Sequence, residues 1–231
     1  MNFISLLSTL VTLAFAVSVL NRYRLKGGNH LLWWGMGLGW YGLGTLSEVI
    51  LGAAFNPWVL KLWYLSGAML TAAWLGQGTV FLLVRRKGWA KWSAWVLLAV
   101  SALAAVLVFS ASILPAAAHF RPDLPVSSQY RTMMSRPALM IVLTILLNIY
   151  GSLTLIGGAL YSAYLFWRKQ VLASRMWGNI LIAAGAMSPA IGGSLLRAGL
   201  GDWLYVSEFL GAVVMYLGFW LAVKDRPVKQ R

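Results

Sequence analysis

The sequence predicts an all-α membrane protein with seven transmembrane helices, and three observations carry this prediction. Of the 231 residues, 60% are hydrophobic and only 10% are charged, whereas a soluble domain has about 25% charged residues. The apolar residues form continuous runs long enough to cross a bilayer, without the alternation of a β-barrel. Basic residues gather in short segments between these runs, as orientation signals do.

The first three apolar runs cover residues 2–20, 31–55 and 58–84. The basic segment 22–26 follows the first run, whereas a cleavable signal peptide has its positive charges in front. We therefore expect a retained first helix. The Asn56-Pro57 dipeptide separates the second and third runs and predicts a tight turn between two helices.

The fourth apolar run, 92–114, follows the basic segment 85–91. The longest connection comes next, and it holds four of the seven prolines. This proline density predicts an irregular cap over residues 115–137 without a further helix. The remaining apolar runs cover residues 138–167, 176–196 and 203–223.

The distribution of basic residues predicts how the chain is threaded. Fourteen of the 19 Lys and Arg residues lie in the first, third and fifth connections and in the tail. Basic connections stay in the cytoplasm, so we expect the N-terminus outside, the C-terminus cytoplasmic, and a multi-pass protein of the cell membrane. The same distribution accounts for the net charge of +14 without a nucleic-acid partner; the expected partner of the surface is the lipid bilayer.

The chain also contains a possible internal repeat. Sliding it by 141 residues places the second run on the sixth and the third on the seventh without a gap. Between Gly37 and Ser66, seven of thirty positions are then identical, the pair Tyr64 and Tyr205 among them. The paired runs have the same direction, as a parallel repeat requires. The sequence thus predicts one domain, residues 1–231, of two three-helix units joined by the fourth helix.

This 3+1+3 layout resembles that of the sugar-transporting SWEET and PQ-loop families and of the microbial rhodopsins. The chain contains no Pro-Gln dipeptide, and the seventh run contains no lysine for a retinal Schiff base. The resemblance therefore covers the layout of the helices, and we assign no family from it.

Two acidic residues lie within the apolar runs and suggest a site. Glu48 and Glu208 each lie about two helical turns from the end expected outside, and acids at such depth usually face the bundle interior or water and have a partner. The basic residues Lys61 and Arg197 fall at the same depth or nearer the surface. We predict that these four residues contribute to a ligand-binding site. An ion-pair cluster with a purely structural role is the alternative.

Aromatic residues accumulate near the same acids. Most tryptophans fall at the ends of the runs, where interfacial anchoring explains them. Trp40, Tyr41 and Tyr64, with Trp63 and Trp74, instead cluster on the central hairpin, and Tyr205 is the repeat counterpart of Tyr64. They predict an aromatic wall for an apolar or planar ligand; contact with lipid is the other interpretation.

Catalytic and metal-binding motifs are not found in the sequence. It has no cysteine, two isolated histidines, and no phosphate-binding loop or Ser/His/Asp set. We therefore expect no cofactor, no metal and no enzymatic activity. The leading prediction is a transporter or sensor that binds a small molecule at an outward-facing polar site between the two three-helix units. The alternative is a non-catalytic accessory subunit of a larger membrane complex.

Overall fold

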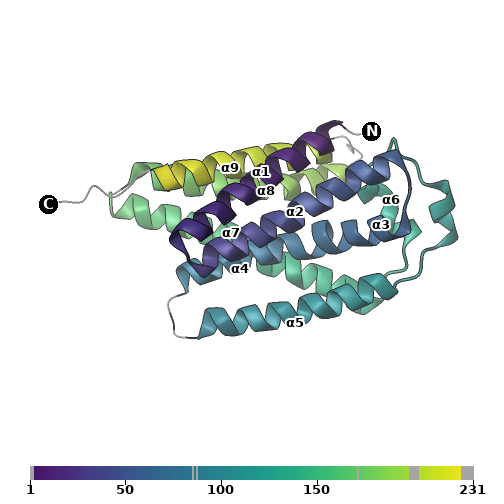
Figure 1. Cartoon of the computed structure of the whole chain (residues 1–231), viewed down its shortest axis with the longest axis horizontal. Coiled ribbons are helices and arrows are strands. Elements are labelled where there is room, and N and C mark those ends of the chain that lie inside the picture. The colour runs from purple at the N-terminus through teal and green to yellow at the C-terminus, as the bar shows by residue number, and fades with distance from the viewer. Residues whose placement is uncertain (1–2, 85, 87, 171, 198–202, 225–231) are drawn as a thin grey trace.

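The chain folds into one elongated helical bundle (Figure 1). A computed structural model describes residues 3–84, 86, 88–170, 172–197 and 203–224. Over these residues an isolated bridge between Ile113 and Met134 is the only β pairing. The long helices are α1 (Phe3–Lys26), α2 (Asn29–Ala53), α5 (Trp89–Ser110), α7 (Ala138–Arg168), α8 (Ala173–Arg197) and α9 (Trp203–Lys224). The start of α1 and the end of α9 lie at opposite ends of the bundle.

The predicted turn at Asn56-Pro57 is confirmed, and its chemistry starts the next helix. The Asn56 side chain accepts hydrogen bonds from the backbone N–H groups of Trp58, at 2.8 Å, and Val59, at 3.3 Å. Pro57 occupies the first helical position, where its missing N–H costs nothing. From there α3 (Pro57–Trp63), a π-helical segment η1 (Tyr64–Leu70) and α4 (Thr71–Leu83) run on as one continuous helix.

The π-helical segment changes which backbone groups are paired within that helix. In its wider turn, each backbone carbonyl pairs with the N–H group five residues ahead, where an α-helix uses the N–H group four residues ahead. The Thr71 hydroxyl donates to the Ser66 carbonyl at 2.8 Å. The Asn148 amide of α7 donates to the Ala68 carbonyl at 2.7 Å. Side chains from its own helix and from a neighbour therefore add hydrogen bonds to the carbonyls of this segment, and the Ser66 carbonyl also accepts the backbone N–H of Thr71.

Within the described part of the chain, five helical segments are long and apolar enough to cross a membrane: α1, the continuous helix Pro57–Leu83, α5, α7 and α9. The helices α2 and α8, with 25 residues each, are not among them. Both are middle helices: α2 packs against α1 and the Pro57–Leu83 helix, and α8 packs against α7 and α9. Both helices carry glycines at these contacts, which close packing requires and which lower their hydropathy.

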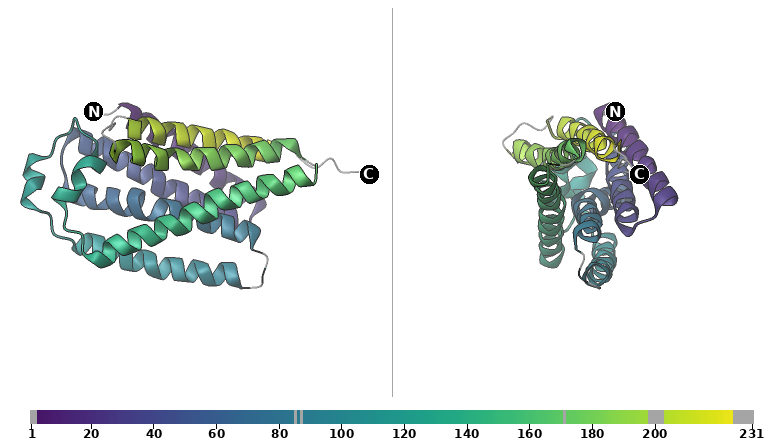
Figure 2. Two further views of the ribbon diagram at one scale, coloured as in Figure 1. Left: turned by 180° about the vertical axis from the view of Figure 1, so that it is seen from behind. Right: turned by 90° about the vertical axis from the view of Figure 1, so that its left-hand side faces the viewer.

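The bundle thus contains two groups of three helices. The groups meet along two contacts, where α4 packs on α7 and where α1 packs on α9. The helix α5 joins the groups in sequence but lies at the edge of the bundle, with sparse contacts to α3, η1, α4 and α7 (Figure 2). No residue of α5 therefore lines the cavity between the two groups.

The connection between α5 and α7 contains two short helices, so the prediction of a cap without a helix is wrong. These are η2 (Pro115–His119) and α6 (Val126–Met133). The prolines do not break them, because Pro115, Pro125 and Pro137 lie at or just before a helix start, where proline is favoured, and Pro122 lies in the turn between the two helices. We call residues 115–137 the cap. Backbone hydrogen bonds from Leu114 to Met133, 2.8 Å, and from Ser135 to Ser112, 2.9 Å, close it.

Candidate functional site

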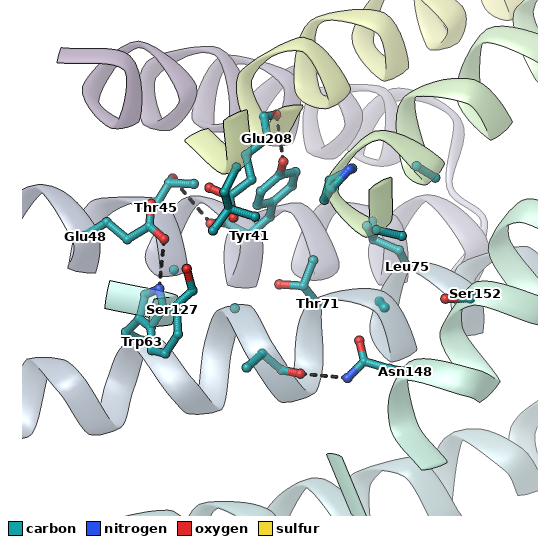
Figure 3. A pocket seen from close by; sticks show the side chains of 18 of the residues that line it. Tyr41, Thr45, Glu48, Trp63, Thr71, Leu75, Ser127, Asn148, Ser152 and Glu208 are labelled. Atoms are coloured by element: carbon teal, nitrogen blue, oxygen red, sulfur yellow. Dashed lines mark hydrogen bonds between the residues drawn. The ribbon is translucent and has the colours of Figure 1, made fainter. Parts of the chain in front are cut away.

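A cavity of about 410 Å³ lies between the two three-helix groups (Figure 3). Residues of α2, α3, η1 and α4 line one side, and residues of α7, α8 and α9 line the other. At the capped end, α6 contributes Ser127, Tyr130 and Arg131. The volume falls within the range of about 300–1,000 Å³ that is usual for small-molecule sites.

Glu48 reaches the cavity from α2 and is held by two donors. The Ser5 hydroxyl of α1 donates to Glu48 Oε2 at 3.2 Å, and the Trp63 indole of α3 donates to Glu48 Oε1 at 3.0 Å. The Glu48 side chain is buried, with 4% of its residue surface exposed. Because each donor comes from a different helix, the position of this carboxyl depends on how three helices pack.

Glu208 reaches the same cavity from α9, in the other three-helix group. Both acids thus line one cavity. Glu208 Oε2 is buried and has no hydrogen-bond partner among the residues that the structure describes. The Tyr41 hydroxyl donates to the Glu208 backbone carbonyl at 2.8 Å and so ties α2 to α9 beside the carboxyl pair.

The α2 wall of the cavity follows from helical spacing. Tyr41, Thr45 and Glu48 recur at intervals of four and three residues and therefore share one face. Gly44, on the same face, lies so close to Gly67 of η1 that an added Cβ would stand 3.0 Å from the Gly67 Cα. The missing side chains let α2 and the π-helical segment approach closely, which brings Trp63 within reach of Glu48.

An aromatic cluster closes the capped end of the cavity. The Tyr130 ring of α6 packs on Trp63 and Tyr64, with ring centroids 5.3 and 5.5 Å apart. The Arg136 guanidinium lies 5.0 Å from the centroid of the same ring, within the range of a cation–π contact. The cap thus packs on α3, whose Trp63 donates to Glu48.

The eight residues predicted for a ligand site fall into distinct places. Tyr41, Glu48 and Glu208 line the cavity. Trp40, Tyr64 and Tyr205 pack behind its walls: Trp40 lies against Trp74, with centroids 5.8 Å apart, the Tyr64 hydroxyl is 3.0 Å from Thr144 Oγ1, and the Tyr205 hydroxyl accepts from Val126 N–H at 3.3 Å. The two remaining predictions concern the basic residues.

Lys61 does not reach the carboxyls, and its assignment to the site is corrected. Its ammonium donates to the Phe109 carbonyl at 2.9 Å and lies 5.1 Å from the centroid of the Trp58 ring. Phe109 belongs to the last turn of α5, where unpaired carbonyls and the helix dipole attract a cation. The side chain of Arg197 lies outside the described residues.

The sequence contained a signal for one contributor that the prediction missed. Ser5, Ser8, Thr9 and Thr12 are buried on one face of α1, at a spacing of three and four residues that marks a helix face. This polar stripe points at the bundle, and Thr9 hydrogen-bonds Thr45 at 2.9 Å. Asn148 and Thr71, which also line the cavity, carry no comparable pattern.

The chemistry available in the cavity is that of carboxyl, hydroxyl and amide groups, which bind hydrogen-bond donors and exchange protons. Among the described residues no group of three or more His, Cys, Asp or Glu could hold a metal ion. Comparison of the chain with protein-family models, with curated proteins and with solved structures finds no match in any of the three.

Proposed function

We propose that the protein crosses the cell membrane seven times, with its N-terminus outside and its C-terminus in the cytoplasm. At 25 residues, α2 and α8 are each about 37 Å long, enough for a hydrocarbon core of about 30 Å. Seven crossings also agree with the start of α1 and the end of α9 at opposite ends of the bundle. The orientation rests on the excess of basic residues at the end where α1, α7 and α9 finish.

Cysteine labelling tests this threading. We expect a cysteine in place of Ala118 to react with a membrane-impermeant maleimide on intact cells, and one in place of Lys91 to react only after lysis. Both positions are exposed, one in the cap and one at the start of α5. The chain has no native cysteine, so the unsubstituted protein is the control. Reaction at position 91 alone on intact cells would reverse the proposed orientation.

The two three-helix groups are proposed to be a parallel repeat. Equivalent glycines make equivalent contacts: an added Cβ at Gly37 or Gly44 in α2, or at Gly178 or Gly185 in α8, would stand 2.6–3.0 Å from the backbone of the next helix. The contact partners on α9, Gly218 and Gly211, lie two and three residues further along than the gapless alignment places them, less than one helical turn. The contact of α4 with α7 corresponds to that of α9 with α1.

The function we propose is the binding of a small molecule in the cavity between these groups, for transport. One observation carries it: the cavity of about 410 Å³ contains a carboxyl from each group. A buried carboxyl is costly within a membrane and usually marks a functional path. Transport is favoured over sensing because the site lies at the interface of two similar units, where rocking of one unit against the other gives alternating access.

A ligand panel tests this function. We expect at least one chemical class among small amines, carboxylates, alcohols and sugars to raise the melting temperature of the purified protein in detergent, since a ligand bound only to the folded state stabilises it. Thr71→Trp, which fills the cavity (Figure 3), should remove the effect. Leu153→Trp, on the exposed face of α7 with 70% of its residue surface exposed, should keep it. Stabilisation that persists in Thr71→Trp would contradict the assignment.

A role as accessory subunit is the second candidate, and α5 is the feature that favours it. This helix packs sparsely on the bundle, and Trp92, Trp95 and Val106 are each more than half exposed along it. A stoichiometric protein partner after purification from native membranes in mild detergent would support the subunit role. A homogeneous protein without a partner supports transport.

A further inference from the structure

We propose that the cavity binds an organic cation and that one proton, held by the pair of carboxyls Glu48 and Glu208, leaves when the cation enters. This inference rests on the proposed function, because it names the class of molecule that the same cavity takes. It would make the protein a cation/proton exchanger. Three features carry it: the presence of both carboxyls in one cavity, the charges that surround them, and the lining of the space beside them.

The first feature is that Glu48 and Glu208, one from each three-helix group, line the same cavity, where Glu208 Oε2 is buried without a hydrogen-bond partner among the described residues. Two ionised carboxylates that share a buried site repel each other. One of the two therefore holds a proton, as in other paired carboxyls. The Ser5 and Trp63 donors bond the two oxygens of Glu48, so Glu48 is the better stabilised anion. Glu208, which lacks such donors among the described residues, is the natural carrier of the proton.

The second feature is the charge around the pair. The titratable groups that face it are Tyr41 from α2 and Tyr130 and Arg131 from α6. The described lining residues of α7 and α8 contain no titratable side chain, α1 presents only Ser5, and Lys61 of α3 bonds to α5. Arg131 is exposed at the capped end and hydrogen-bonds the Tyr130 hydroxyl at 3.5 Å. With one proton on the two carboxyls, the pair thus gives the inner cavity a charge of about −1.

The third feature is the lining. The rings of Tyr41, Trp63 and Tyr130 border the cavity together with apolar residues of α8 and α9. Aromatic faces attract a cation, and apolar walls accommodate its hydrocarbon part. An ammonium supplies the hydrogen-bond donors that Glu208 Oε2 lacks. A carboxylate ligand would be repelled by the negative charge of the pair. A neutral alcohol would supply one hydrogen-bond donor, fewer than an ammonium.

The exchange balances charge. With the proton bound, the pair has a charge of −1; after the proton has left to water and an ammonium has bound, the two carboxylates and the cation again sum to −1. No net charge enters the apolar cavity, so the large cost of burying an uncompensated ion is avoided. Because the proton and the cation compete for the same oxygens, a proton gradient can drive the cation in the opposite direction.

Three ligands of nearly the same shape test this inference: 2-phenylethylamine, 2-phenylethanol and phenylacetate. Binding to the purified protein is measured by titration calorimetry in weakly buffered detergent between about pH 6 and 8, where an alkylammonium stays charged. Proton release is followed with an indicator dye. We expect the amine to bind and to release about one proton, its Kd falling about tenfold for each unit rise in pH, as displacement of one proton requires. The alcohol and the carboxylate should bind at least tenfold more weakly.

Two variants test whether the released proton comes from the carboxyl pair. Glu208→Gln has no proton to displace, so proton release and the pH dependence of Kd should disappear. Asp123→Asn is the matched control, because this exposed acid is paired with Arg121 at 2.7 Å in the cap and does not line the cavity. The hydrogen bond from Arg121 lowers the pKa of Asp123, and the variant should behave as the unsubstituted protein. If Glu208→Gln does not fold, the slope and proton count of the unsubstituted protein still decide.

The outcomes also separate this inference from the proposed function. Tight binding of the alcohol or the carboxylate, blocked by Thr71→Trp, would leave the cavity as a ligand site and overturn the cation. Binding of the amine without proton release and with a constant Kd would overturn the exchange. A pH-dependent proton uptake with no ligand bound, together with no stabilisation by any class in the wider panel, would overturn both in favour of a proton path.

Discussion

Replacing Gly151 by alanine is expected to destabilise the bundle by about 1–3 kcal/mol, the usual cost of overpacking. The added Cβ would overlap the carbonyl group of Ala72 and stand 2.6 Å from the backbone nitrogen of Ala73. Backbone cannot move aside as a flexible side chain can. The substitution would therefore push α7 away from α4, along one of the two contacts between the three-helix groups. The loss should outweigh the intrinsic helix preference of alanine, about 1 kcal/mol over glycine.

Gly157→Ala is the matched control for this prediction. Gly157 lies in the same helix, and an added Cβ there meets no atom within 4 Å. We expect its melting temperature to equal or slightly exceed that of the unsubstituted protein. Thermal unfolding in detergent, followed by tryptophan fluorescence, measures both variants. An equal response of the two would mean that α4 and α7 do not pack at Gly151 as described.

Trp63→Phe is expected to have the second large effect, because it removes a donor from a buried carboxyl. The indole of Trp63 donates to Glu48 Oε1 at 3.0 Å, and phenylalanine has no such group. A buried charged group left without one hydrogen bond costs about 1.5–3 kcal/mol, in addition to the packing lost with the larger ring. The variant should also weaken cation binding, since the position of Glu48 would no longer be fixed.

Trp33→Phe separates the hydrogen bond from the packing. Trp33 and Trp63 are equally buried, at 8% and 7% of the residue surface, and Trp33 packs on Trp74 with centroids 4.7 Å apart. No hydrogen bond from the Trp33 indole is found among the described residues. Trp33→Phe should therefore lose only packing energy and retain ligand affinity. If the two variants unfold at the same temperature, the bond from Trp63 to Glu48 contributes little.

Much of the architecture could be predicted from local sequence. Continuous apolar runs set the helices, and the Asn56-Pro57 pair set the turn between α2 and α3. These features depend on residues close in the chain, for which length, hydropathy and capping chemistry are sufficient guides. The cap shows where such reasoning fails. Its prolines predict a segment without helices, yet Pro115, Pro125 and Pro137 each lie at or just before the start of a helix. The position of a proline relative to the helix start decides its effect.

The candidate site also combines residues that the sequence identified with contacts that only the fold decided. The sequence by itself identified Glu48 and Glu208 as unusual, because an acid within an apolar run is costly wherever the run folds. Only the tertiary structure decided their partners. Lys61 is the nearest base along the chain, but it bonds the end of α5, while Ser5, 43 residues away, bonds Glu48. Charge and depth can be read from one helix. Which side chains meet depends on the rotation and close approach of several helices, set by contacts such as that of Gly44 with Gly67, and this information is distributed over the whole chain.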